Sequence, residues 1–98
     1  MSDHAILIQR KVVPCDLRTW ASQFENADAR RVAKYDEGGV EVSTVFLGLN
    51  HAWGGGPPLW FETMVFGGPL DGEQERCTTF DEAERQHAEM VERVKAAK

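Results

Sequence analysis

The feature that most constrains the fold is a pair of largely apolar runs, residues 40–49 and 59–66, separated by a short loop. The loop contains three consecutive glycines followed by two prolines, a composition that excludes regular structure. Valine, leucine and phenylalanine dominate both runs, and residues of this kind favour strands. The stretch therefore predicts two neighbouring strands in the middle of an antiparallel sheet.

The order of residues within each run predicts which face of the sheet they occupy. Val40, Val42 and Phe46 fall on one face of the first strand. Beyond Thr44 both faces become apolar, which predicts that this end of the strand is covered on both sides. For the second strand, one face is expected to carry Leu59, Phe61 and Val65, and the other Trp60, Glu62, Met64 and Phe66.

A long helix is predicted at the C-terminal end of the sequence. Thr79 and Glu82 have the spacing of a capping box, and the residues that follow are acidic at the start of the segment and basic at its end. Its apolar positions recur with helical periodicity and form one stripe, namely Phe80, Ala83, His87, Met90, Val91 and Val94. We expect this stripe to pack across one face of the sheet.

The N-terminal part predicts a strand and a short helix. Residues 5–13 are rich in aliphatic side chains and are expected to form one strand, which Pro14 ends. Asp16 is a suitable N-cap for the helix that follows. The apolar stripe of that helix consists of Leu17, Trp20, Ala21 and Phe24.

Three weaker patterns complete the predicted sheet. Residues 30–35 indicate a strand, residues 36–39 a glycine-containing turn, and residues 73–78 a short edge strand whose charges discourage pairing with another chain. The fold expected is a single α+β domain over residues 1–98. It is an antiparallel meander of about four strands, with the C-terminal helix packed on one face and a short N-terminal helix.

Composition limits the classes of partner. A net charge of −5 argues against nucleic acid, which basic faces usually bind. Cys15 and Cys77 have no metal-binding spacing and are expected to be free thiols in a reducing cytoplasm. No apolar run is long enough for a signal peptide or a membrane span. The expectation is a cytoplasmic protein with no cofactor and no nucleic-acid or membrane partner.

His87 and Glu62 are candidate catalytic residues. His87 lies in the apolar stripe of the long helix, where it would be a general base or, alternatively, a core histidine held by a hydrogen bond. Glu62 shares a strand face with Trp60 and Met64, and burial there would raise the pKa of its carboxyl. The alternative for Glu62 is a paired or partly solvated carboxylate. Helix packing on that face would bring Glu62 and His87 together.

His51 is a third catalytic candidate. With Glu62 and His87 it makes up a set of two histidines and one carboxylate, a combination found in metal sites. The three lie on separate elements without a short motif, so no metal site is predicted. The three glycines also do not predict a phosphate-binding loop, since Pro57 and a strand follow them instead of a helix with lysine.

The central loop is the candidate binding surface. Trp53 on an exposed loop would suit a contact with another protein, because tryptophan anchors are favoured at interfaces. The alternative is that Trp53 folds back over the end of the sheet. The residues expected to contact a partner are His51, Trp53, Gly54, Gly55, Gly56, Pro57 and Trp60.

Three runs of sequence carry a resemblance to a known group. VSTVFLGLNH, GGGPPLWFETMVFGGPLDGE and TTFDEAERQHAEMV resemble small proteins encoded by bacteriophages and prophages, a group without a known activity. The resemblance covers about residues 40–94. It implies a protein made inside an infected or lysogenic bacterium, and it carries over no catalytic residue.

Three classes of function are therefore expected. The first is a phage-encoded accessory protein that binds a host or phage protein and could inhibit a bacterial defence system. The second is a small hydrolase or metal-dependent enzyme that uses His51, Glu62 and His87. The third is an assembly protein that forms a homo-oligomer through the sheet edge.

Overall fold

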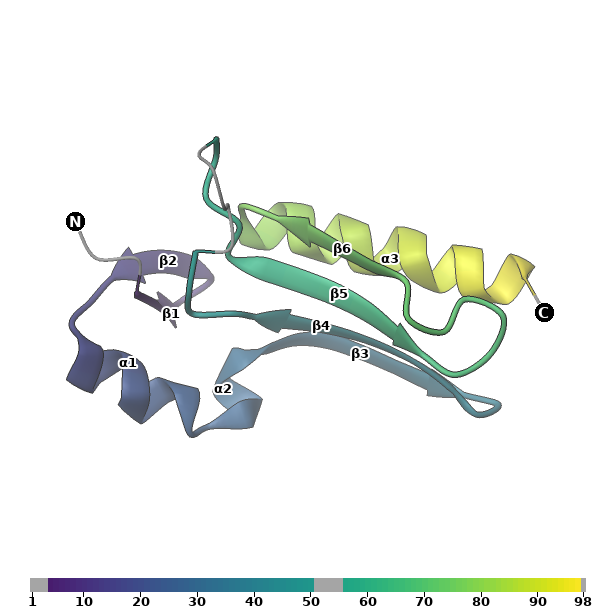
Figure 1. Cartoon of the computed structure of the whole chain (residues 1–98), viewed down its shortest axis with the longest axis horizontal. Helices are drawn as coiled ribbons and strands as arrows, with labels where there is room; N and C mark the ends of the chain where they lie inside the picture. Colours follow the sequence, from purple (N-terminus) through teal and green to yellow (C-terminus); the bar gives the residue numbers. More distant parts are fainter. Residues whose placement is uncertain (1–3, 51–55, 98) are drawn as a thin grey trace.

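The computed structural model of the chain describes residues 4–50 and 56–97. In chain order the elements are β1 (Ala5–Ile8), β2 (Lys11–Pro14), α1 (Leu17–Phe24), α2 (Ala27–Arg30), β3 (Arg31–Glu37), β4 (Val40–Phe46), β5 (Phe61–Phe66), β6 (Gln74–Cys77) and α3 (Phe80–Ala96). Strands β3 to β6 pair in sequence order as an antiparallel sheet, and β1 and β2 form a separate hairpin. Figure 1 shows α3 along one face of the four-stranded sheet. The predicted α+β meander with a C-terminal helix is confirmed.

The core lies between α3 and the face of the sheet that α3 covers. Burial alternates along β4 and β5, so that every second side chain points toward α3. The fully or nearly buried residues of this face are Val40, Val42, Thr44 and Phe46 on β4 and Phe61, Thr63 and Val65 on β5. From α3, Ala83, Met90 and Val94 complete the core. The predicted shared face of Val40, Val42 and Phe46 is confirmed, as is that of Phe61 and Val65.

Strand β4 ends at Phe46, and the Leu47 N–H still donates to the Trp60 carbonyl oxygen. Val45, on the face away from α3, is half-buried, so the cover expected on both faces at this end of the strand is partial. The chain meets the hairpin there, because the Ala5 N–H donates to the Gly48 carbonyl oxygen at 3.0 Å. His4 and Leu49 form an isolated antiparallel bridge at the same place. The residues after Phe46 thus form the contact between the sheet and the hairpin.

Helix α3 begins as the sequence predicts. The Glu82 N–H donates to the Thr79 hydroxyl at 3.2 Å, and the Thr79 N–H donates to the Glu82 carboxylate at 3.0 Å. This reciprocal pair satisfies two backbone donors that a helix start otherwise leaves without partners. Asp81 and Glu82 in the first turn also complement the helix dipole.

The N-terminal strand is the main error of the sequence prediction. The chain turns back at Gln9 and Arg10, so residues 5–13 form most of a hairpin instead of one strand. Both turn residues have positive φ, 48° for Gln9 and 69° for Arg10, as in a type I′ turn. Such turns normally contain glycine or asparagine, so the sequence carried no signal for this one. Contacts of Arg10 with Phe80 and Glu84 on α3 hold the turn in place.

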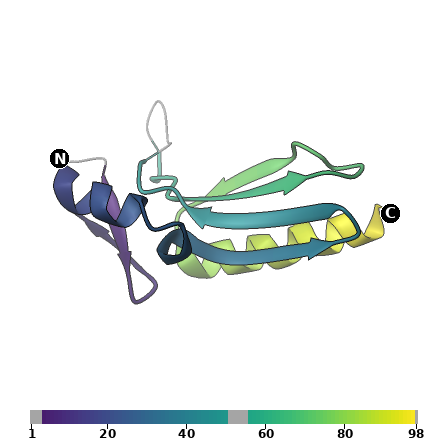
Figure 2. The ribbon, with the colours of Figure 1, turned by 90° about the horizontal axis from the view of Figure 1, so that it is seen from below.

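Helix α1 lies beyond the end of the sheet. Figure 2 shows α1 and the hairpin together, outside the four strands and away from the C-terminal end of α3. The predicted N-cap is confirmed, since the Thr19 N–H donates to the Asp16 carboxylate at 2.8 Å. No residue of α1 is fully buried, and Leu17 is 62% exposed. Within residues 4–50 and 56–97, no helix combines the length and the apolar character needed to cross a membrane.

Candidate functional site

His87 points into the core from α3. Its Nδ1 lies 2.7 Å from the Thr44 hydroxyl oxygen, which lies 2.7 Å from that of Thr63. Both threonines are fully buried. Burial lowers the pKa of the His87 imidazole below its ordinary value of 6.5, so the neutral form prevails at neutral pH. This is the geometry of a core histidine held by a hydrogen bond.

Glu62 lies on the other face of the sheet. Its carboxylate accepts a hydrogen bond from the Arg76 Nε at 2.9 Å, in an ion pair between β5 and β6. Because side chains alternate along a strand and Thr63 points toward α3, Glu62 points away from it. The sheet therefore separates Glu62 from His87, and the expected meeting of these two residues does not occur.

The remaining candidates divide between described and undescribed parts of the chain. His51, Trp53, Gly54 and Gly55 lie outside the residues that the structure describes. Gly56 and Pro57 are exposed and Trp60 is half-buried. Over residues 4–50 and 56–97, no three His, Cys, Asp or Glu side chains are grouped so that they could hold a metal ion. Cys15 and Cys77 are free thiols.

Trp60 is held at the end of the core that faces the hairpin. Its N–H donates to the Cys77 carbonyl oxygen at 3.0 Å, and its own carbonyl accepts from the Leu47 N–H at 2.7 Å. The indole lies nearly parallel to the Phe46 ring, with 6.4 Å between ring centroids. Its backbone is thus fixed on both sides, which makes Trp60 a rigid aromatic surface.

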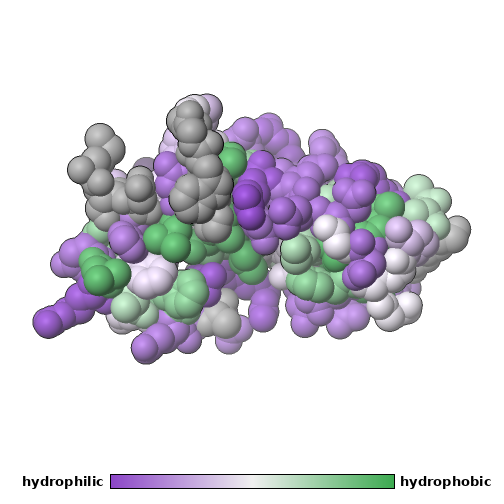
Figure 3. Space-filling model, viewed as in Figure 1, coloured by the Kyte–Doolittle hydropathy of each residue, from purple (hydrophilic) through white to green (hydrophobic). Residues whose placement is uncertain are grey.

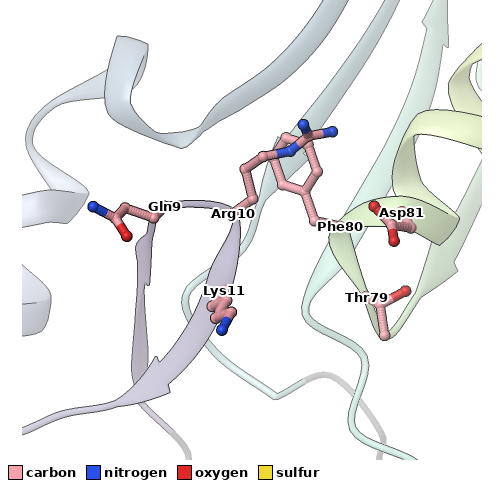
Figure 4. A pocket seen from close by; sticks show the side chains of 6 residues that line it. All are labelled: Gln9, Arg10, Lys11, Thr79, Phe80 and Asp81. Atoms are coloured by element: carbon pink, nitrogen blue, oxygen red, sulfur yellow. The ribbon is translucent and has the colours of Figure 1, made fainter.

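Trp60 lines a groove between the hairpin and the start of α3, which we call the hairpin groove. It has a volume of about 490 Å³, and its lining residues are Arg10, Lys11, Val12, Pro14, Trp60, Thr78, Thr79 and Phe80. A second hollow of about 370 Å³ shares Arg10, Lys11, Thr79 and Phe80 with it and extends it to Gln9 and Asp81. Figure 4 shows this second hollow, with the hairpin on one side and the start of α3 on the other.

Arg10 ties the tip of the hairpin to α3. Its guanidinium lies over the Phe80 ring, 4.7 Å from the ring centroid, and also forms an ion pair with Glu84. The neighbouring Lys11 is exposed and has no ion-pair partner in the described part of the chain. Figure 3 shows apolar surface at the hairpin end of the molecule, interspersed with hydrophilic side chains. The apolar lining residues of the groove are Val12, Pro14, Trp60 and Phe80. The groove therefore combines an apolar floor with an unpaired positive charge at its rim.

Sequence reasoning missed two elements of this geometry. Thr44 and Thr63 were not predicted as partners of His87, although the alternation that places Val42 and Phe61 in the core also places both threonines there. The groove was also missed, because β2 was read as the continuation of β1. Only a turn at Gln9 and Arg10 brings β2 beside Phe80.

Comparisons of the chain with protein-family models, with curated proteins and with solved structures gave no match. The resemblance to phage and prophage proteins stays a prediction from the sequence. What bears on function is the geometry around Trp60, an open groove with an apolar floor. The His87 imidazole and the Glu62 carboxylate, in contrast, are both engaged by other side chains.

Proposed function

We propose that this chain is a small phage-encoded accessory protein that acts by binding a protein of the host or of the phage. The role that we propose for this binding is inhibition of a bacterial defence system. The observation that carries the proposal is the hairpin groove, an open hollow that the half-buried Trp60 and Phe80 line.

The positions of the catalytic candidates support binding over chemistry. An acid and a base that act on one substrate must both reach it within hydrogen-bond distance. Glu62 and His87 lie on opposite faces of the sheet, and each is already hydrogen-bonded to another side chain. This arrangement removes the main support for the hydrolase alternative.

The properties of the groove suit a protein ligand. Its volume of about 490 Å³ is large enough to receive one or two apolar side chains. Tryptophan and arginine are the residues that most often dominate binding energy at interfaces, and the groove contains Trp60 and Arg10. The Trp60 indole packs on the Phe46 ring and the Arg10 guanidinium on the Phe80 ring, so binding requires little further loss of conformational freedom.

Affinity capture from bacterial lysate tests the proposal. Immobilised protein should retain a specific partner from lysate of the host, identified by mass spectrometry. Lys11→Glu should abolish retention, because it reverses a charge at the groove rim. Arg18→Glu, an equal charge reversal on the exposed surface of α1, should leave retention unchanged.

Two results would overturn this proposal. One is that no protein is retained beyond those that an unrelated acidic protein of similar size retains. The other is equal retention by the Lys11→Glu and Arg18→Glu variants. The proposed role in defence has its own test, since expression of the protein should restore plaque formation by a phage that the host otherwise restricts.

A further inference from the structure

One edge of the hairpin is closed by side-chain contacts. The Leu7 N–H donates to the Gln23 side-chain oxygen at 2.8 Å, and the Gln23 side-chain nitrogen donates to the Leu7 carbonyl oxygen at 2.8 Å. Further along β1, the Ala5 N–H donates to the Gly48 carbonyl oxygen at 3.0 Å. Both backbone groups of Leu7 and the Ala5 N–H, on the outer edge of β1, are therefore bonded to α1 and to the chain after β4.

These contacts also show which backbone N–H and carbonyl groups of β2 point away from β1. Pairs of opposite residues in an antiparallel ladder alternate between hydrogen-bonded and non-hydrogen-bonded. Leu7 lies opposite Val12, and both backbone groups of Leu7 are turned outward to Gln23. Leu7 and Val12 are therefore a non-hydrogen-bonded pair. It follows that the Val12 N–H and carbonyl point to the outer edge of β2.

Within residues 4–50 and 56–97, no backbone hydrogen bond occupies the outer edge of β2, which lies beside the groove. Among the described strands, β2 pairs with β1 alone. Val12 and Pro14 line the groove together with Trp60 and Phe80. In Figure 4, β2 is the hairpin strand nearer to the start of α3. A strand edge with free donors and acceptors is a template for pairing with another chain.

We propose that the hairpin groove binds an extended segment of a partner protein as an added strand on the open edge of β2. The inference rests on the proposed function and specifies how the partner protein is bound. The Val12 N–H and carbonyl supply two main-chain hydrogen bonds, and the Pro14 carbonyl supplies an acceptor. Pro14 has no N–H, so the edge offers a short ladder with one favoured register.

The alternation of side chains along the added strand determines which partner residues suit each face of the hairpin. The partner residue opposite Val12 directs its side chain to the face that Val12 shares with Trp60 and Phe80. An aliphatic or aromatic side chain suits that position. Its two neighbours point to the opposite face, which carries the unpaired positive charge of Lys11. The partner segment is therefore an apolar residue with an acidic neighbour, which lies opposite Lys11.

Amide hydrogen exchange in the free protein tests whether the edge is open. Val13 lies in the hydrogen-bonded pair with Ile6, so its amide should exchange at least about tenfold more slowly than that of Val12. Equal protection of the two amides would overturn the proposal. Protection of Val12 that grows with protein concentration would do the same, because a second copy would then occupy the edge.

Binding is tested with a defined probe, the capped peptide acetyl-Thr-Glu-Ile-Glu-Thr-amide, and with a library randomised at its central residue. The tightest member should slow exchange of the Val12 amide. Methylation of its backbone nitrogens should weaken binding by about tenfold or more, because the lost hydrogen bonds belong to the ladder. Lys11→Glu should weaken it too, whereas Arg18→Glu should have no effect.

The two proposals fail in different ways. If no library member binds at about 1 mM while Lys11-dependent capture from lysate persists, strand addition is wrong and protein binding stands. If a peptide binds but methylation has no effect and the Val12 amide is unchanged, the groove binds side chains without an added strand, and the inference again fails. If capture also fails, both proposals fall.

Discussion

The two ends of the molecule are held together in different ways. The sheet and α3, which we call the body, share a continuous core in which Phe61, Val65 and Met90 are at most 1% exposed. The hairpin with α1 and α2, which we call the N-terminal lobe, contains one fully buried residue among those described, Ala5. The body is stabilised by extensive apolar packing, and the lobe depends on a few directed contacts.

Those contacts mostly join a side chain to a backbone group or to a ring. Gln23 bonds both backbone groups of Leu7. The Arg30 Nε donates to the Phe46 carbonyl oxygen at 3.1 Å, and its guanidinium lies 4.1 Å from the centroid of the Phe24 ring. Each such hydrogen bond adds only about 0.5–1.5 kcal/mol of net stability. A single substitution in the lobe should therefore affect only its surroundings, whereas a substitution in the core should lower the stability of the whole body.

The largest effect is expected in the body. Phe61→Ala removes a fully buried ring that packs on Phe46 and Phe80, and should lower the free energy of unfolding by about 3–5 kcal/mol. Chemical denaturation measures it. Phe66→Ala is the matched control, since Phe66 is 47% exposed on the other face of the same strand. Equal losses for the two variants would refute the assignment of faces.

The junction between the two regions should give the next largest effect. Gly48 has a φ of 78°, and a Cβ there would lie 2.6 Å from the Trp20 Nε1. Gly48→Ala should therefore cost about 2–4 kcal/mol, from backbone strain and from displacement of Trp20. Thermal or chemical unfolding followed by tryptophan emission measures the loss.

Gly72→Ala separates the two causes. Gly72 has a φ of 88° and no atom within 4 Å of its would-be Cβ, so this variant should lose only the conformational part, about 1 kcal/mol. If Gly48→Ala costs no more than Gly72→Ala, the contact between Trp20 and Gly48 does not hold the lobe.

A smaller effect is expected where α3 begins, beside the groove. Thr79→Ala removes the hydroxyl that accepts from the Glu82 N–H, and should cost about 1 kcal/mol. Thr79→Ser keeps the hydroxyl and is the control, with a stability near that of the natural protein. Urea denaturation of both variants compares them. An unchanged midpoint for Thr79→Ala would show that the cap contributes nothing.

The smallest effect is a pH dependence that arises within the body. The pKa of His87 is lowered by burial in the folded state, while the unfolded chain keeps the ordinary value of 6.5. Below pH 6.5 the unfolded state therefore binds more protons, and the free energy of unfolding falls until the pH passes below the folded pKa. Above that window the imidazole is neutral in both states and the contribution is constant.

Denaturation between about pH 5 and pH 8 measures this dependence. His87→Gln is the comparison, because an amide does not titrate but can still bond the Thr44 hydroxyl. The difference between the two proteins should shrink as the pH falls through the window. A difference that stays constant would mean that His87 has the same pKa folded and unfolded.

The body was predictable because its signals are local. The capping box of Thr79 and Glu82, the stripe of α3, and the alternation around Phe46 and Phe61 each lie within a few residues. Packing of an amphipathic helix on a sheet follows from such patterns. The partner of His87 could also have been found, by extending the alternation of β4 and β5 to their threonines.

The lobe and the groove were not predictable because their causes are distant in sequence. Neither glutamine nor arginine favours the positive φ of Gln9 and Arg10. Contacts of Arg10 with Phe80 and Glu84 on α3 hold the turn instead. The separation of Glu62 from His87 depended on which face α3 covers. The alternation of β5 left that choice open, because the opposite face also carries apolar side chains, Trp60, Met64 and Phe66.

The ion pair between Arg10 and Glu84 also implies an order of folding steps during synthesis of the chain. These residues are 74 positions apart, so Arg10 leaves the ribosome long before its partner has been translated. At that stage the turn at Gln9 and Arg10 lacks the contacts that hold it, while each strand of the meander can pair as soon as its neighbour emerges. The hairpin groove is therefore a late product of folding, completed only when α3 docks on the sheet.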